Sequence, residues 1–254
     1  LLNEEASVYV SYSEGYTVPD VGRILRDGSA DSVAQLDPKA QLVKNYELGF
    51  KGDWRRLSTS AAVFYNTSDL GLRFTGDANN TNLAPKREPE KVYGFEGSLD
   101  IRLNDQWKTG QTLTWLEGKV DTNDDGHFDE YKSGVTVPPL KVTAYLEHQT
   151  TQQWRNHLDM LYSGDRNRFN SNNTAADADP NDKLKRQFAE GEVQNFITLN
   201  LVSAYQLPVG DLSISISNLL NKNYFSVESQ ARNRDAQYAK ATGRTFGVAY
   251  SVDW

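Results

Sequence analysis

The chain has 254 residues, a net charge of −7, no cysteine and a mean hydropathy of −0.65. This length suits one large all-β domain or two smaller domains, and no run of about 18 apolar residues is present that could form a membrane-spanning helix. The absence of cysteine excludes a disulfide framework and a thiolate metal site. The mild acidity, without a basic stripe, argues against nucleic acid as a partner.

Alternation of apolar and polar residues with a period of two recurs along the whole chain and predicts β-strands. In the clearest case, Tyr93, Phe95 and Leu99 alternate with Glu96 and Asp100. Ten strands are predicted in this way, and no amphipathic helix is predicted. In chain order the strands are residues 6–13, 46–51, 57–66, 93–103, 107–119, 141–147, 152–163, 193–207, 211–220 and 243–254.

The connections between these strands alternate strictly between short turns and long polar segments. The long segments are residues 16–43, 76–89, 120–139, 164–192 and 225–242. An up-and-down barrel with tight turns at one rim and long loops at the other explains this alternation, which is typical of transmembrane barrels. Several strands reach the roughly 9 to 11 residues that cross a bilayer at a tilt.

The charged positions of the strands separate a membrane barrel from a soluble β-sandwich. Glu47, Lys51 and Glu96 would be unpaired charges in the core of a sandwich, whereas they face a wet lumen in a wide barrel. A Lys or Arg facing lipid near the midplane costs about 2–4 kcal/mol, and the apolar positions in the middle of the best strands carry neither. We therefore predict an all-β fold, an antiparallel up-and-down transmembrane barrel, with a soluble all-β binding module as the alternative.

The last predicted strand places Tyr250, Val252 and Trp254 on the lipid-facing side. In a closed barrel this strand would pair with the first one, and Trp254 would lie at the periplasmic interface, which favours amphipathic rings. A final strand of this kind resembles the assembly signal of bacterial outer-membrane proteins. The pattern therefore predicts localisation in the bacterial outer membrane.

Five stretches carry a more specific signal. They are SEGYTVPD at 13–20, VKNYELGFK at 43–51, VYGFEG at 92–97, NLLNKNY at 218–224 and GRTFG at 243–247. In this order, and spanning almost the whole chain, they resemble motifs of TonB-dependent outer-membrane receptors. Within that family the likeness is to ferric siderophore receptors of the hydroxamate and aerobactin type.

This resemblance implies a barrel of about 22 strands with a plugged lumen. Residues 1–254 would then form the C-terminal part of the barrel, and the plug domain, the TonB-contacting motif and the N-terminal strands would be absent from the chain. It also implies uptake of a ferric siderophore, energy-coupled to the TonB complex through the plug, with no intrinsic cofactor. A self-contained ten-stranded porin or adhesin barrel is the alternative.

Ferric siderophores are often anionic and rich in oxygen, so arginine and tyrosine side chains near the long loops are the candidate ligands. The competing interpretation is that most of these side chains are solvated charges of the rim. The candidates are Tyr16, Arg23, Arg26, Arg73, Arg87, Arg166, Arg168, Arg232, Arg234 and Tyr238.

One long segment contains an incomplete calcium loop. Oxygen-bearing side chains occupy loop positions 1, 3, 5 and 9 as Asp121, Asn123, Asp125 and Asp129. The bidentate carboxylate that position 12 requires is replaced by Lys132. We expect an acidic turn built around Asp125-Gly126, with weak calcium binding as the alternative.

No nucleophile elbow, zinc motif or phosphate-binding loop is present. Of the three histidines, His127 lies in a predicted outer loop, whereas His148 and His157 lie near a short turn and in a strand. No carboxylate pair is assigned to His127, so we expect that the protein is not an enzyme.

Overall fold

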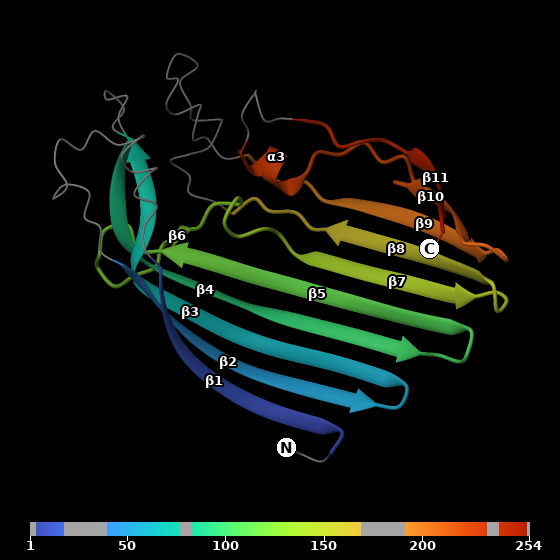
Figure 1. Cartoon of the computed structure of the whole chain (residues 1–254). Coiled ribbons are helices and arrows are strands. Elements are labelled where there is room, and N and C mark those ends of the chain that lie inside the picture. The colour runs from blue at the N-terminus through green and yellow to red at the C-terminus, as the bar shows by residue number, and fades with distance from the viewer. Residues whose placement is uncertain (1–3, 18–39, 77–82, 169–190, 233–238, 253–254) are drawn as a thin grey trace.

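A computed structural model of the chain describes residues 4–17, 40–76, 83–168, 191–232 and 239–252. These residues form a single antiparallel sheet that curves like a section of a barrel wall (Figure 1). Its elements are β1 (Ala6–Thr17), β2 (Gln41–Trp54), β3 (Leu57–Gly76), β4 (Leu83–Arg102), β5 (Trp107–Val120), β6 (Glu130–Tyr131), β7 (Lys141–Gln149), β8 (Trp154–Ser163), β9 (Phe196–Gln206), β10 (Asp211–Ser217), α3 (Val227–Arg232) and β11 (Thr245–Ser251). No helix among these residues is long and apolar enough to cross a membrane.

All ten predicted strands are present, and each pairs with its neighbour in the sequence. The two-residue strand β6 pairs with the end of β5 and lies off this path. Short turns lie at one rim of the wall and the long connections at the other (Figure 1). The prediction of an up-and-down meander with alternating short and long connections is therefore confirmed.

The structure departs from the prediction in three of the long segments, one of which, residues 120–139, contains the short strand β6. Strand β4 begins at Leu83, inside the segment 76–89 that was predicted to be a loop. The helix α3 lies inside the segment 225–242, where no helix was predicted. Its first turn is capped by the Ser226 hydroxyl, which accepts a hydrogen bond from the Ser229 N–H at 3.2 Å, and serine is a favoured residue at this position.

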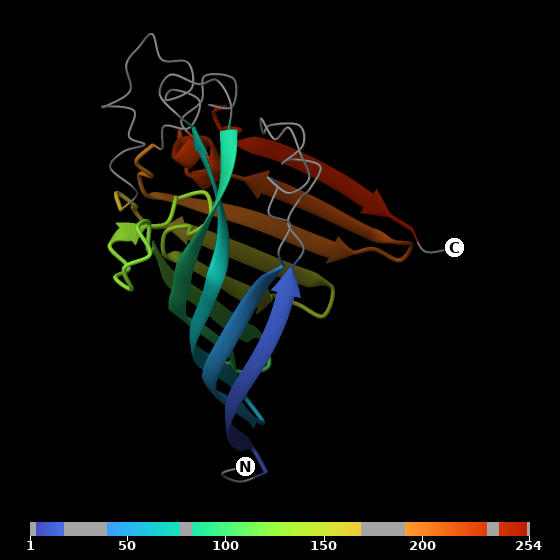
Figure 2. The same ribbon diagram turned by 90° about the vertical axis from the view of Figure 1, so that its left-hand side faces the viewer.

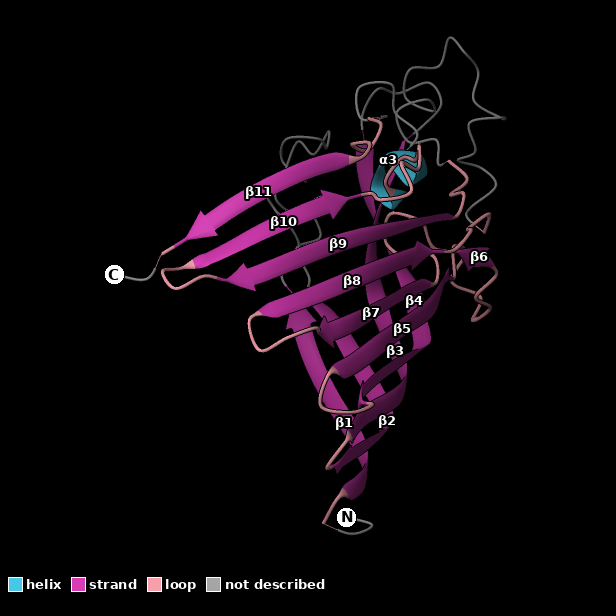
Figure 3. Ribbon diagram, turned by 90° about the vertical axis from the view of Figure 1, so that its right-hand side faces the viewer, coloured by secondary structure: helices cyan, strands magenta, loops and turns pink. Residues whose placement is uncertain are grey.

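The first and last strands do not pair with each other among the described residues. The sheet runs in order from β1 to β11, so these two strands are its edges. Figures 2 and 3 show them at opposite margins of the wall. Pairing of the first and last strands, which a barrel closed within this chain would require, is thus not observed. An open wall agrees with the prediction that these strands are part of a wider barrel, since barrel diameter grows with strand number.

The apolar positions share one face of the sheet, as the alternation predicted. Direct cross-strand partners lie on the same face, and the register places one apolar row across β1 to β5. The row consists of Val10, Leu48, Val63, Phe95 and Trp115, which are between 36% and 81% exposed. A row of large apolar side chains exposed on a long sheet is suited to contact with hydrocarbon.

Aromatic side chains border this apolar face at both rims. Near the long loops, four tyrosines follow one another across β1 to β4, and near the short turns lie tryptophans and further tyrosines. From Tyr46 to Trp54 the strand rises about 27 Å, or about 20 Å across the bilayer at a tilt of about 40°. Two aromatic rows at this spacing match the girdles of a transmembrane barrel. Their members are Tyr12, Tyr46, Tyr65 and Tyr93 at the loop rim, and Trp54, Trp107, Trp154, Tyr205 and Tyr250 at the turn rim.

The most deeply buried apolar side chains lie at the loop rim and not between two layers of sheet. Val137, Val193 and Ala231 are at most 1% exposed. A Cβ atom added to Gly134 would lie 3.2 Å from the Ala231 Cβ and 3.9 Å from Val193. The helix α3 therefore packs closely against the segments that follow β6 and precede β9. The described parts of these connections form a layer over the loop rim, which we call the loop layer (Figure 3).

The stretch NLLNKNY has a structural explanation in its first residue. Asn218 is 5% exposed and has a φ of 49°, a region that asparagine and glycine tolerate best. Its Oδ1 accepts a hydrogen bond from the Lys222 N–H at 2.8 Å, and its Nδ2 donates to the carbonyl oxygens of Lys222 and Thr242 at 2.9 and 3.2 Å. One side chain thus joins both ends of the β10–β11 connection.

Replacing Asn218 with alanine is expected to lower the free energy of unfolding by about 3 kcal/mol, because three partly buried hydrogen bonds are lost and alanine is strained at positive φ. Asn218→Gly keeps the backbone conformation accessible and should cost about 1 kcal/mol less. Urea unfolding of the protein folded into lipid vesicles measures both variants. Equal unfolding midpoints for Asn218→Ala and the unaltered protein would contradict this role.

Candidate functional site at the inner face and the loop rim

The inner face of the wall carries a polar network around Asp100. The Tyr145 hydroxyl donates a hydrogen bond to the Asp100 carboxylate, and the Lys108 Nζ lies 3.9 Å from the same oxygen. The Tyr145 ring stacks on His157 with 5.3 Å between the ring centroids. These residues come from β4, β5, β7 and β8, and the alternation of each strand turns them to the same face.

His157 joins two carboxylates of this network. Its Nδ1 is 3.5 Å from the Glu147 Oε2, and its Nε2 is 2.9 Å from the Asp159 Oδ1. Further along the same face, the Tyr9 hydroxyl donates to the Glu47 Oε1 at 2.6 Å. Partly exposed carboxylates, hydroxyls and an imidazole make this a surface for a polar partner or for water, as predicted for the lumen side.

At the loop rim, Arg166 forms a buried ion pair with Glu117. The two side chains are 6% and 4% exposed, and the Arg166 Nη2 donates to the Glu117 Oε1 at 2.9 Å and to the Lys132 carbonyl at 3.0 Å. Arg168 approaches the other Glu117 oxygen at 3.5 Å but is 59% exposed. The Arg166 guanidinium is thus committed to the protein, whereas that of Arg168 is accessible.

A second, partly buried ion pair joins the loop layer to the wall. The Lys132 Nζ forms an ion pair with the Glu90 Oε2, both side chains being less than a fifth exposed. The Gln41 Nε2 donates to the other Glu90 oxygen at 2.9 Å. Lys132, which replaces the carboxylate expected at position 12 of the calcium loop, therefore anchors this loop to β4. The sequence analysis did not predict either ion pair, Arg166–Glu117 or Lys132–Glu90. A signal was present for the first pair, because Glu117 is a carboxylate at an apolar position of its strand and such a residue needs a specific partner.

The helix α3 presents Arg232 at the same rim. The Arg232 Nε donates to the Glu228 Oε1 at 2.9 Å, one turn earlier. Gln230, which is 7% exposed, fixes the helix because its amide exchanges hydrogen bonds with the backbone of Gln194. Arg232 is therefore held on a short but well-anchored element.

The other predicted ligand residues fall in two groups. Tyr16, at the rim end of β1, is 78% exposed, and Arg73 and Arg87 belong to the paired ends of β3 and β4. Tyr16, Arg73, Arg87, Arg166, Arg168 and Arg232 thus all come from the loop rim. The candidates Arg23, Arg26, Arg234 and Tyr238 lie outside the described residues, as does Trp254 of the predicted assembly signal.

The acidic loop forms a compact turn around Asp121, which is 1% exposed. The Asp121 carboxylate accepts hydrogen bonds from the N–H groups of Asn123, Asp125 and Gly126 at 3.3, 3.3 and 2.8 Å. The expected turn at Asp125-Gly126 is present, with a φ of 85° at Gly126. In the part of the chain that the structure describes, no cluster of three or more His, Asp or Glu side chains is arranged around a metal position. Calcium binding by Asp121, Asn123, Asp125 and Asp129 stays a prediction.

This turn has an expected pH dependence. A hydrogen bond from the His127 N–H, and then one from the Asn123 side chain, lower the pKa of Asp125 below its usual value of about 3.9. Because the folded-state pKa is depressed, the contribution to stability is present at neutral pH and is lost as the pH falls through the lowered pKa. An NMR titration of the Asp125 carboxyl should give a midpoint below about 3.9, and Asn123→Ala should raise it. A midpoint at or above the usual value would contradict this expectation.

Comparison with known proteins shows which family of proteins this chain is similar to. A family model described as "TonB dependent receptor-like, beta-barrel" matches residues 1–219. Ferric aerobactin receptors of Klebsiella pneumoniae and Escherichia coli are each 28% identical over 277 residues, which cover 99% of this chain and 34% of each relative. A rhizobactin receptor of Rhizobium meliloti is 25% identical over 134 residues, covering 47% of this chain and 17% of the relative. The chain spans about a third of the length of the aerobactin receptors.

Solved structures agree in fold. The copper transporter OprC superposes with a TM-score of 0.72 at 18% identity, covering 96% of this chain and 36% of OprC. The pyoverdine receptor FpvA of Pseudomonas aeruginosa superposes with a TM-score of 0.70 at 16% identity, covering 99% of this chain and 34% of FpvA. At these identities the similarity establishes the arrangement of strands alone.

The curved antiparallel wall, its apolar outer face between two aromatic rows and its loops at one rim define a β-barrel of the outer-membrane class. The chain belongs to the TonB-dependent receptor β-barrel family, since the family model matches most of its length. Members of this family are outer-membrane proteins of Gram-negative bacteria and are receptors, not enzymes.

Proposed function

We propose that the protein containing this chain imports a ferric siderophore across the outer membrane, energy-coupled through TonB. The observation that supports this most is the similarity to ferric aerobactin receptors over 99% of the chain. The alternatives of a passive porin or an adhesin have no comparable support. The siderophore is the ligand, and the proposal requires no resident cofactor.

The chain is proposed to form the C-terminal part of the barrel in such a receptor. The other two-thirds of the relatives' length would then supply the N-terminal strands and a plug domain. The polar network around Asp100 and His157 lies on the face that a plug would occupy, and its half-exposed carboxylates suit a polar protein surface. Coupling to the TonB complex would pass through that plug.

The siderophore is proposed to bind at the loop rim. The exposed side chains of Tyr16 and Arg168 and the partly exposed side chain of Arg232 can offer aromatic and guanidinium contacts to an anionic oxygen-rich ligand. Arg166 would contribute indirectly, because its ion pair with Glu117 holds the segment that carries Arg168. The candidates Arg23, Arg26, Arg73, Arg87, Arg234 and Tyr238 complete the proposed set.

Charge reversal of Arg232 and Arg234 together tests the site in the full-length receptor. The variant should bind a ferric hydroxamate siderophore at least about tenfold more weakly, as followed by quenching of tryptophan fluorescence. Arg55→Glu with Arg56→Glu makes the same change in the β2–β3 turn at the opposite rim, and its affinity should stay unaltered. Unchanged affinity in the first variant would remove Arg232 and Arg234 from the site. Transport itself is tested by deleting the gene of the receptor: a deletion strain that still imports the siderophore would refute the transport function.

A further inference from the structure

A row of lysines lies just above the aromatic row of the outer face. Lys44 faces Thr67 across β2 and β3, Thr67 faces Lys91 across β3 and β4, and Lys91 faces Lys119 across β4 and β5. Each position is two residues nearer the loop rim than an aromatic or acidic residue of the next row down, so all point to the outer face. We call Lys44, Lys91 and Lys119 the lysine row.

The Lys91–Lys119 end of the lysine row concentrates positive charge. Lys91 and Lys119 are direct cross-strand partners, an arrangement that is destabilising for like charges. Among the residues that the structure describes, neither forms an ion pair, and their ammonium groups lie over the rings of Phe128 and Tyr131 at 4.3 and 4.8 Å. The nearest acidic partner in the row is Glu14, opposite Lys44 at the sheet edge. The Lys91–Lys119 end is therefore suited to an anion from outside the protein.

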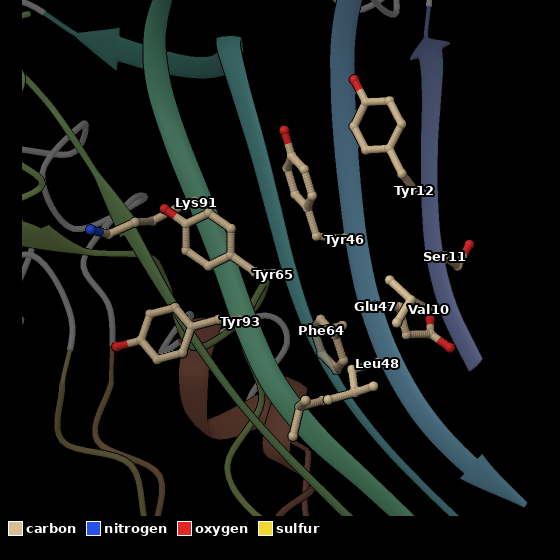
Figure 4. A pocket seen from close by; sticks show the side chains of 11 residues that line it. Val10, Ser11, Tyr12, Tyr46, Glu47, Leu48, Phe64, Tyr65, Lys91 and Tyr93 are labelled. Atoms are coloured by element: carbon tan, nitrogen blue, oxygen red, sulfur yellow. The ribbon is translucent and has the colours of Figure 1, made fainter. Parts of the chain in front are cut away.

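Directly below the lysine row, the outer face is hollowed into an apolar groove of about 580 Å³. Figure 4 shows the Tyr46, Tyr65 and Tyr93 side chains along it, with Leu48 near its lower end and Lys91 at its left-hand margin. The rings of Tyr65 and Tyr93 stack with 6.5 Å between centroids, and Tyr93 meets Trp115 edge-on at 6.1 Å. The groove therefore has an apolar body and a cationic end.

We propose that this groove and the lysine row bind a lipid with an anionic phosphate headgroup. The acyl chain would lie over Leu48 and the tyrosine rings, and the phosphate would sit between the ammonium groups of Lys91 and Lys119. Lysines next to an interfacial aromatic row lie at the depth of the lipid headgroups, where they contact negatively charged headgroups. The positive charge of the lysine row favours an anionic lipid over a second protein as the occupant of the outer face, because an apolar patch of a protein would leave the lysines unpaired. The proposal does not depend on which ligand the receptor imports.

The test uses the full-length receptor in detergent micelles, titrated with dioleoyl phosphatidic acid or with dioleoyl phosphatidylcholine and followed by native mass spectrometry. We expect phosphatidic acid to bind more tightly than phosphatidylcholine. Lys91→Gln with Lys119→Gln should weaken phosphatidic acid binding about 25-fold, since each lysine near the surface contributes about fivefold. The matched control is Lys51→Gln with Lys141→Gln, which removes two positive charges from the inner face and should bind like the unaltered protein.

Heat modifiability on gels verifies that each variant is folded, and Lys91→Gln alone provides a milder variant if the double variant does not fold. Equal binding of the two lipids would overturn the proposal, as would unaltered binding by the lysine-row variants. Complete displacement of phosphatidic acid by inorganic phosphate at equal concentration would show a site for free phosphate and would also overturn it.

Discussion

Replacing Arg166 with alanine is expected to lower the free energy of unfolding by about 3–5 kcal/mol, the largest effect of any single change considered for this protein. The change leaves the Glu117 carboxylate, 4% exposed, with Arg168 at 3.5 Å as its remaining cationic partner. It also removes the hydrogen bond to the Lys132 carbonyl, which joins the segment after β8 to the segment after β6. Urea unfolding in lipid vesicles measures the loss.

Two further variants separate the ion pair from general damage to the rim. Arg168→Ala removes a guanidinium that is 59% exposed, so it should cost less than about 1 kcal/mol. Arg166→Met combined with Glu117→Met replaces both buried charges by apolar side chains and should recover most of the stability. The account of this pair would be wrong if Arg166→Ala cost no more than Arg168→Ala.

Placing an arginine on the outer face at mid-strand is expected to cost about 2–4 kcal/mol, because the guanidinium would face hydrocarbon. Ala61 offers this position, since it lies between Phe50 of β2 and Gly97 of β4 on the apolar face. Ala61→Arg should therefore lower the free energy of unfolding in lipid vesicles by this amount.

The adjacent residue provides the matched control. Ala62 has the same side chain in the same strand but faces the inner side, opposite Gly49 and Glu96. Ala62→Arg should change the free energy of unfolding by less than about 1 kcal/mol, because the new charge meets water and a carboxylate. Similar costs for the two variants would contradict the assignment of faces.

The strands could be predicted because each one lies between two different solvents along most of its length. Residues 93–103 alternate without a break; β4 contains residues 93–102 and confirms the face of Phe95, although the strand begins ten residues earlier, at Leu83. Residues 83–89 fall inside the predicted loop because two prolines and a run of charged residues interrupt the alternation there. The helix α3 has six residues, too few to show a helical period.

The candidate site was predictable in place but not in detail. The loop rim could be located from the alternation of connection lengths, and Tyr16, Arg168 and Arg232 lie there. That Arg166 is buried against Glu117 depends on a contact between residues 49 positions apart, and no local pattern carries such information. The lysine row likewise exists only through the register of four strands, because Lys44, Lys91 and Lys119 are far apart in the sequence.

The central claim is that one face of the wall meets lipid and the other meets water, and the chain's lack of cysteine makes it directly testable. Single cysteines placed in turn at residues 93–102 can carry a nitroxide spin label in bilayers, where oxygen reports lipid and a polar nickel complex reports water. The account predicts that collisions with oxygen are high at Phe95, Leu99 and Ile101 and low at Glu96, Ser98 and Asp100, with the reverse for nickel. Accessibility that does not alternate between these two sets, or that alternates in the opposite sense, would contradict it.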